Sequence, residues 1–253
     1  MRIKKNIRFQ ARKIHRYLGL FIGIQFFLWT LGGLYFSWNN MDDVHGKTLR
    51  KEVKKEQQFN LNQINKSITN FKLLAISDSI LSIELIENGI SPLLCIGYLK
   101  NNSKKLQLID LKKQEPRNSI TKTEAIAIAK ANLNFTSLNI KEVKYITQND
   151  VSKHGEYREK PLPAFAITLD DSSNTTFYVA TELGKITSVR NGNWRRFDFL
   201  WMLHTMDYQQ RDTITNWVLR TFSIMGMLTI CSGFFLFGLT SPTIRKFFGK
   251  QEK

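Results

Sequence analysis

The chain has 253 residues, of which 42% are hydrophobic, and a formal net charge of +16 at pH 7. Its cysteines and histidines lack the spacing of a zinc site, a haem-attachment motif or an HExxH helix, and the sequence has no Walker, GxGxxG or GxSxG motif. The sequence therefore disfavours the enzyme classes with such signatures. Its basic balance is typical of chains that meet an anionic membrane surface, an acidic partner or nucleic acid.

The chain begins with a basic flank, residues 1–17, followed by an uncharged run at 18–38. A helix over this run would be about 31 Å long, close to the hydrocarbon thickness of a bilayer. A cleaved signal peptide is the alternative. The apolar run is too long for one, and the bulky Tyr35 and Trp38 stand where a small-residue cleavage site would be needed. We therefore predict an uncleaved first transmembrane helix.

The middle of the chain is soluble in character. We interpret residues 39–58 as a charged linker, and two similar stretches follow it at 59–116 and 117–192. Each starts with an amphipathic helix and continues into an apolar run, a polar turn and an alternating run, so we predict two units of one helix on a short antiparallel sheet. Thr121 and Glu124 have the spacing of a capping box. Duplication explains the likeness, and chance similarity is the alternative.

The second unit carries two more specific expectations. Its additional residues fall in the charged segment 148–160, which contains His154 and is predicted to be a loop. Segments 163–169 and 175–181 should form a hairpin in which alternate residues face opposite sides. The larger set should face the core, namely Phe165, Ile167 and Leu169, and the smaller set should face away, namely Ala164, Ala166 and Thr168.

Residues 193–212 form a connector that begins NWRRFDFLWMLHTMDY. At helical spacing Phe197, Leu200, Trp201 and His204 share one face. The histidine could hold a cofactor, or the helix could lie between the external domain and the lipid headgroups. Apolar residues occupy nearly every side of the helix, so we favour an interfacial amphipathic helix.

A second uncharged run occupies residues 221–239, within a predicted second transmembrane helix at 213–241 and before a basic tail at 242–253. A buried soluble helix is the alternative, and Asp212 or Thr213 is the expected N-cap. Both flanks are basic, so both termini should be cytoplasmic and residues 40–212 external. The same rule explains the basic flank without nucleic acid, which leaves the lipid bilayer as the first expected partner. The aromatic residues expected at the outer interface are Tyr35, Trp38, Trp201 and Trp217.

Small residues suggest how the two spans pack. Gly19 and Gly23 form a GxxxG pattern in the first span, and Gly226 and Gly233 offer matching surfaces in the second. We expect the two spans to pack together through these glycines, with homodimerisation as the alternative. Gln25, in the middle of the first span, should face another helix rather than lipid.

The chain resembles the PepSY-associated transmembrane proteins of bacteria over nearly its whole length. The segments that carry the likeness occur in a specific order: IHRYLGLFIG at 14–23, TKTEAIAIAKANL at 121–133, LPAF at 162–165, FYVATELGKITSVR at 177–190 and FDFLWMLHTMDY at 197–208. The resemblance implies an α+β fold in which two transmembrane helices flank a periplasmic domain of two PepSY-like units. It also implies the bacterial inner membrane and either of two roles, a regulatory module or a haem-carrying reductase for ferric siderophores.

In the reductases of that family, histidines of the spans carry haem, and His15 and His204 match two of them. The additional spans of those reductases are absent here, so the ligand set is incomplete. A bilayer of about 30 Å separates the two histidines, so they cannot bind one haem b within one chain. Haem would need a homodimer, a partner protein, or Met202 or Met206 as a ligand.

We therefore expect a non-enzymatic binding, regulatory or accessory module of a membrane assembly, with no catalytic residue and no metal site. Its expected partner is a membrane or periplasmic protein that the sequence does not identify. The alternative is a haem-binding electron carrier in iron uptake.

Overall fold

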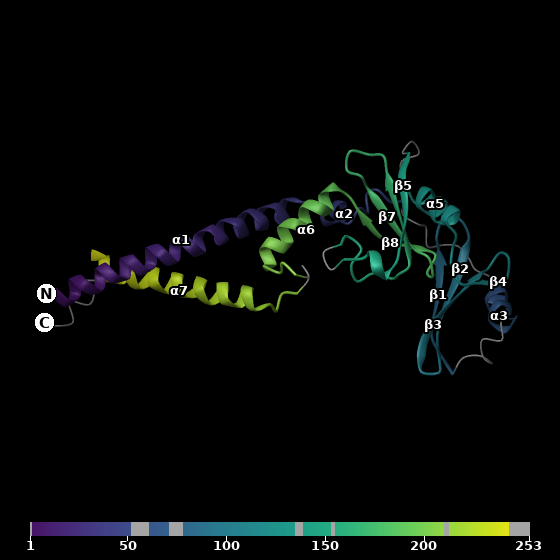
Figure 1. Cartoon of the computed structure of the whole chain (residues 1–253), viewed down its shortest axis with the longest axis horizontal. Helices are drawn as coiled ribbons and strands as arrows, with labels where there is room; N and C mark the ends of the chain where they lie inside the picture. The colour runs from purple at the N-terminus through teal and green to yellow at the C-terminus, as the bar shows by residue number, and fades with distance from the viewer. Residues whose placement is uncertain are drawn as a thin grey trace. The chain divides into compact units, whose positions relative to one another are not determined.

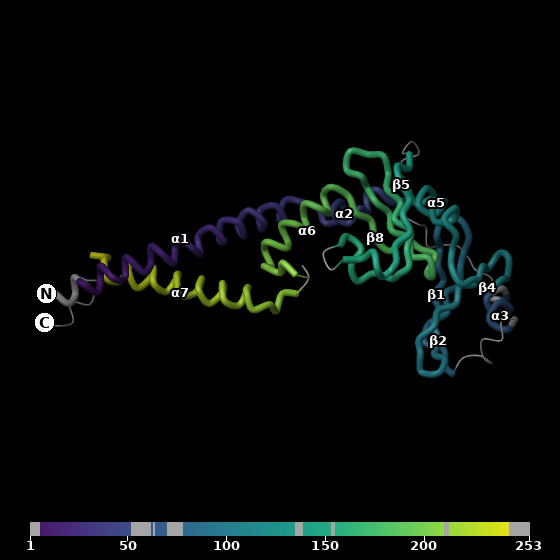
Figure 2. Tube along the Cα trace, viewed as in Figure 1, coloured from purple at the N-terminus to yellow at the C-terminus, as the bar shows by residue number. Residues whose placement is uncertain are grey.

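A computed structural model of the chain describes residues 2–51, 61–70, 78–134, 139–152, 155–209 and 213–242. It has an α+β fold with two long apolar helices and two antiparallel sheets of four strands each. The chain divides into two compact units (Figures 1 and 2). Unit 1 comprises Met1–Asn39 and Phe197–Lys253, and unit 2 comprises Asn40–Arg196.

Unit 1 is helical. Its helices α1 (Arg2–Trp38) and α7 (Trp217–Thr240) are both long and apolar enough to cross a membrane, and the second part of α6 (Gly192–Thr205) belongs to the same unit. The predicted flank at 1–17 is not a separate segment, because α1 runs through it without interruption. Its Lys, Arg, Gln and Ala residues are good helix formers, and no Gly or Pro breaks the run.

The second apolar helix starts later than expected. Its N-cap is Asn216, whose side chain accepts a hydrogen bond from the Leu219 N–H at 2.8 Å. Asp212 lies outside the described residues. The backbone N–H of Thr213 instead donates to the Asp207 carboxylate at 2.8 Å, so Thr213 belongs to the preceding turn and the expected cap was wrong.

Unit 2 contains both sheets. The first has the order β1-β2-β3-β4 and follows helix α3 (Leu61–Asn70); its strands are Ser79–Glu87, Pro92–Lys100, Ser103–Asp110 and Glu115–Arg117. The second has the order β5-β6-β7-β8 and follows helix α5 (Lys122–Ala131); its strands are Ile140–Ile146, Ala164–Leu169, Thr176–Ala180 and Lys185–Arg190. Each half is thus one helix followed by an antiparallel meander, as predicted, with β4 and β8 as strands that the pattern did not indicate.

Two of the hydrophobic clusters in unit 2 join its helices to its sheets. Ile64 and Ile68 of α3 pack on one face of the first sheet, against Leu94, Ile96, Tyr98, Ile109 and Leu111. A larger core joins the two halves, because α5 and the second sheet share it with Leu93, Cys95 and Leu108 of the first sheet. The two predicted PepSY-like stretches therefore fold as one compact unit rather than as two separate domains.

The predicted hairpin is confirmed. Strands β6 and β7 are antiparallel, with Ile167 opposite Phe177, and Ile167 and Leu169 lie in the larger core with Phe165 packed at its margin. The other face is covered as well. Tyr157 packs there against Ala164, Ala166 and Tyr178, and it comes from the segment predicted to be a loop. That segment also contains the short 3-10 helix η1 (Gln148–Asp150), while His154 lies outside the described residues.

The predicted linker at 39–58 contains regular structure in its described residues. It begins with the short helix α2 (Met41–Val44), capped by the side chain of Asn40, and Val44 is buried. Further on, Arg50 forms an isolated β-bridge with Leu133. Only residues 52–58 of the linker lie outside the described chain. The charged composition did not indicate these contacts, because the short helix α2 buries only one apolar residue, Val44.

Candidate functional site

His204 lies in an aromatic cluster of unit 1. Its ring is 5.3 Å from that of Trp29, 5.7 Å from that of Phe36 and 6.2 Å from that of Trp201. Phe197 adds a fourth ring, 4.7 Å from Phe36. The predicted face of α6 therefore exists, but it packs on α1. Phe197 and Trp201 on this face contact Phe36 of α1, whereas Phe199 of the same helix is exposed, so the interfacial position of α6 stays a prediction.

Three polar atoms in this part of unit 1 are buried without a hydrogen-bond partner among the described residues: His204 Nδ1, Trp29 Nε1 and Tyr35 Oη. His204 Nδ1 faces α1 at Gly32, where an added Cβ would lie 3.9 Å from it. Gln25 Nε2 donates to the Leu203 carbonyl at 3.2 Å. The expectation that Gln25 faces another helix is thus confirmed, and that helix is α6.

His15 lies elsewhere on α1, beside α7. Its Nδ1 is 2.8 Å from Ser232 Oγ, and Ser232 Oγ donates its one proton to the Thr229 carbonyl at 2.7 Å. The donor of the His15–Ser232 hydrogen bond depends on the histidine tautomer: a proton on His15 Nδ1 lets the histidine donate while Ser232 keeps its bond to Thr229. Close approach is possible because Gly233 has no side chain: a Cβ there would come 3.2 Å from His15 Cε1.

The two histidines do not fit a shared haem. His15 and Gly32, which lies beside His204, are separated by 17 positions of α1, or about 26 Å of helix. Met206, a possible second ligand, is buried beside a cavity of only about 10 Å³ lined by Ile22, Gln25, Phe26, Trp29 and Phe222. In the described part of the chain, no group of three or more His, Cys, Asp or Glu side chains could hold a metal ion.

The predicted interfacial and packing residues have different surroundings. Trp38 and Trp217 are highly exposed, whereas Trp201 is half-buried against α1 and the Tyr35 hydroxyl is buried. Gly226 and Gly233 do face α1, where Phe26 and His15 lie closest to them. A Cβ at Gly19 or Gly23 would meet no atom within 4 Å, so these two glycines contribute nothing to the contact with α7. Homodimerisation through them stays a prediction.

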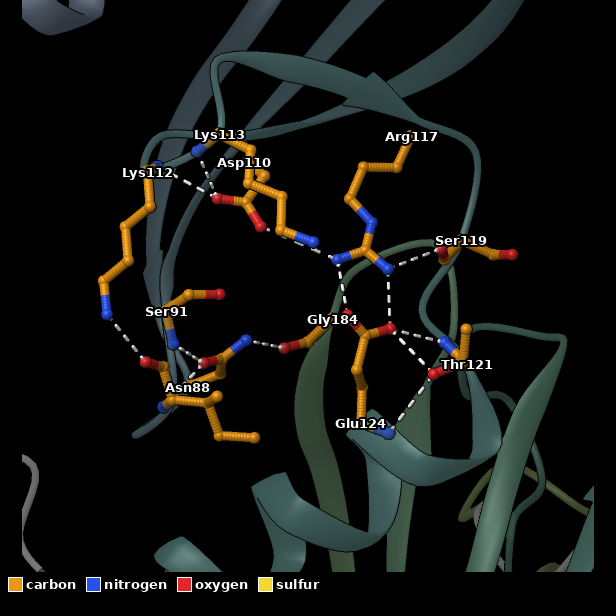
Figure 3. A network of polar contacts seen from close by, with 11 residues as sticks. Asn88, Ser91, Asp110, Lys112, Lys113, Arg117, Ser119, Thr121, Glu124 and Gly184 are labelled. Carbon is orange, nitrogen blue, oxygen red and sulfur yellow. Dashed lines mark hydrogen bonds and ion pairs between the residues drawn. The ribbon is translucent and has the colours of Figure 1, made fainter.

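A polar network in unit 2 joins β3, β4 and the start of α5 (Figure 3). The predicted capping box is present, with the Thr121 side chain accepting from the Glu124 N–H and the Glu124 carboxylate accepting from the Thr121 N–H. Arg117 donates to both Glu124 carboxylate oxygens, at 2.7 and 2.6 Å, and lies 3.8 Å from Asp110. These hydrogen bonds, with those from Thr121, lower the pKa of Glu124 to about 2. The network fixes α5 on the sheet.

A second cluster lies on the face of the second sheet opposite α5. The rings of Tyr157 and Tyr178 stack at 4.5 Å, and Glu156 accepts hydrogen bonds from Arg195 at 2.5 and 3.1 Å. Burial raises the pKa of both tyrosines, so their phenols stay protonated and cannot act as bases at neutral pH. Sequence reasoning missed this cluster, because its members come from a predicted loop and from two separate elements.

The first sheet of unit 2 ends in an edge strand, β1, that carries exposed apolar side chains. In the described chain β1 pairs with β2 alone, and its Leu81 and Ile83 side chains are 48% and 50% exposed. The edge strand of the second sheet, β5, instead has exposed charged side chains at Lys141, Glu142 and Lys144. Charged edge strands resist pairing with other chains, whereas an apolar edge invites it.

Comparison of the chain with protein families, curated proteins and solved structures gives no match.

Proposed function

We propose that this chain is a two-span membrane protein whose unit 2 binds an extended segment of a partner protein at strand β1. The membrane is the bacterial inner membrane, unit 2 is periplasmic, and both termini are cytoplasmic. Two apolar helices and the basic flanks support this assignment, as does the resemblance of the sequence to PepSY-associated transmembrane proteins.

The exposed β1 edge carries the proposal. An open strand presents unpaired N–H and C=O groups to which an extended peptide can add as a further strand, and neighbouring side chains then select its sequence. Leu81 and Ile83 provide apolar contacts for such a peptide. The pairing of β1 with β2 shifts its register between Ile80 and Ser82.

Helix α6 contributes residues to both units. The division between the two units falls within α6, after Arg196. On its first turn Arg195 is held by Glu156 and the Trp194 N–H is capped by Asn191 at 2.7 Å, both within unit 2. Its last turns pack on α1 within unit 1 through Trp201 and His204. Each end of one helix is thus secured in a different unit, which suits a regulatory or accessory role.

Site-specific photo-crosslinking in cells tests the proposal. With benzoylphenylalanine at position 83 of the full chain, we expect one discrete crosslinked product that is lost in a Leu81→Lys background. Position 106 is the control, because Leu106 is 46% exposed in the same sheet but belongs to β3. No product from position 83, or equal products from positions 83 and 106, would show that β1 is not the binding edge.

Absorption spectroscopy tests the alternative function, a haem-binding electron carrier. A haem protein purified in detergent shows a Soret band and a reduced-minus-oxidised α-band. We expect neither after expression with ample haem, because His15 and Gly32, the α1 residue beside His204, are about 26 Å apart along α1. A haem spectrum that disappears in His204→Ala would favour the electron carrier over the binding module.

A further inference from the structure

The apolar runs of α1 and α7 are out of register. In an antiparallel hairpin with aligned apolar runs, the start of one run would meet the end of the other. Here Phe21, near the start of the α1 run, stacks on Phe222, near the start of the α7 run, at 5.6 Å. The hydrogen bond between His15 and Ser232 has the same alignment. The rest of the α7 run therefore lies beside the basic segment of α1, as Figure 1 shows.

This alignment leaves cations beside an apolar surface. Arg8, Arg12, Lys13 and Arg16 occur on α1 at the level where α7 exposes Phe234, Phe235 and Phe237. Neither helix contains an acidic residue, and these four cations form no ion pair with the described residues. Charged side chains at the edge of an apolar region need a counterion or a path to water.

Two grooves between α1 and α7 follow this part of α1, and Ile14 lines both. One has a volume of about 370 Å³ and is lined by Lys13, Ile14, Tyr17, Leu18, Phe21 and Met225. The other has a volume of about 250 Å³ and is lined by Ile7, Gln10, Ala11, Ile14, Ser232 and Phe235. Both are mainly apolar, and the basic residue Lys13 is among those that line the larger one. A ligand that fits both features has acyl chains and an anionic head.

We propose that the α1–α7 pair binds an anionic phospholipid, with an acyl chain in the larger groove and the phosphate beside Lys13, Arg12 and Arg16. The proposal rests on the membrane anchoring proposed above. Basic side chains next to grooves between membrane helices attract anionic headgroups, at about fivefold in affinity for each cation near the surface. The phosphate then supplies a counterion to the cations of α1 where they lie beside α7.

Native mass spectrometry of the detergent-purified full chain tests the site with phosphatidylglycerol, phosphatidylcholine and inorganic phosphate as probes. We expect phosphatidylglycerol to bind at least fivefold more tightly than phosphatidylcholine, and phosphate not to bind. Lys13→Gln should weaken phosphatidylglycerol binding about fivefold. Arg220→Gln is the matched control, because Arg220 lies at the other end of α7 and lines neither groove, and it should leave binding unchanged.

A substitution in the larger groove tests the contact with the acyl chain separately from the charge of Lys13. Met225→Trp should fill the larger groove and weaken binding, whereas Met227→Trp should not, because Met227 is exposed and lines neither groove. Equal affinity for the two phospholipids, or binding of phosphate alone, would overturn the lipid site. Extraction of membranes with alkaline carbonate tests the anchoring separately: a retained chain with no lipid preference refutes only the site, and a released chain refutes the anchoring as well.

Discussion

Glu124 shows how one side chain can serve two neighbouring structures. It caps α5 within its own turn and also binds Arg117 at the end of β4. The Arg117 hydrogen bonds hold the pKa of Glu124 at about 2, below its ordinary value of 4.5. Because the folded pKa is the lower one, the carboxylate stabilises unit 2 fully above about pH 5. That contribution is lost as the pH falls from about 4.5 towards 2.

Replacing the Glu124 carboxylate should weaken the pH dependence of the free energy of unfolding. Glu124→Gln should lower the free energy of unfolding by about 1 kcal/mol at pH 7, a modest value because the side chain is 34% exposed and water screens the pair. Thermal melts of the full chain between pH 3 and 8, followed by near-UV circular dichroism, measure both effects. Glu142→Gln is the control, since its pair with Lys144 is on the surface. Parallel pH curves for Glu124→Gln and the unmodified chain would contradict the assignment.

The alternation of β6 predicts a sharp contrast between two adjacent positions. Ile167 is fully buried in the core shared by both sheets, whereas Thr168 is partly exposed and its hydroxyl lies 3.2 Å from that of Thr176. Ile167→Asp should unfold unit 2 because it buries an unpaired charge, and Thr168→Asp should cost about 1 kcal/mol or less. Melting temperatures of the two variants give the comparison. Equal losses would mean that the register of the strand is wrong.

At the scale of elements, α6 depends on a small residue in α1. An added Cβ at Gly32 would contact both Phe36 and His204, whereas one at Gly33 would meet nothing within 4 Å. Gly32→Leu should therefore displace the His204 end of α6 and raise amide hydrogen exchange in residues 197–205, while Gly33→Leu should leave it unchanged. The adjacent glycine controls for the loss of backbone flexibility. Unchanged exchange in Gly32→Leu would show that α6 is not secured there.

At the scale of the whole molecule, the antiparallel pairing of α1 and α7 puts the start of α1 and the end of α7 on one side of unit 1. The basic flanks predict that this side is cytoplasmic. An alkaline phosphatase fusion near position 120 should be active, because the enzyme needs export to fold, and a fusion at position 253 should be inactive. Activity at position 253 together with none near position 120 would reverse the orientation.

Local rules were sufficient for several features of the fold. The capping box at Thr121 involves residues three positions apart, and the β6–β7 hairpin follows from alternation within a single strand. The two membrane-length helices follow from the length of their uncharged runs. In each case the segment contains its own signal, so the amino-acid sequence by itself determined these elements.

Only the tertiary structure decided which surfaces meet. The sequence indicated an apolar face around His204, yet its partner proved to be Trp29 and Phe36 of α1. The sequence also identified both apolar runs without showing that Phe21 meets Phe222, which brings the cations of α1 beside α7. The physical reason is that hydrophobicity is non-directional: an apolar side chain gains the same free energy from a helix, a sheet or lipid. Which of these surfaces an apolar face contacts depends on how side chains distant in the sequence pack together, and the periodicity of the sequence contains no information on that packing.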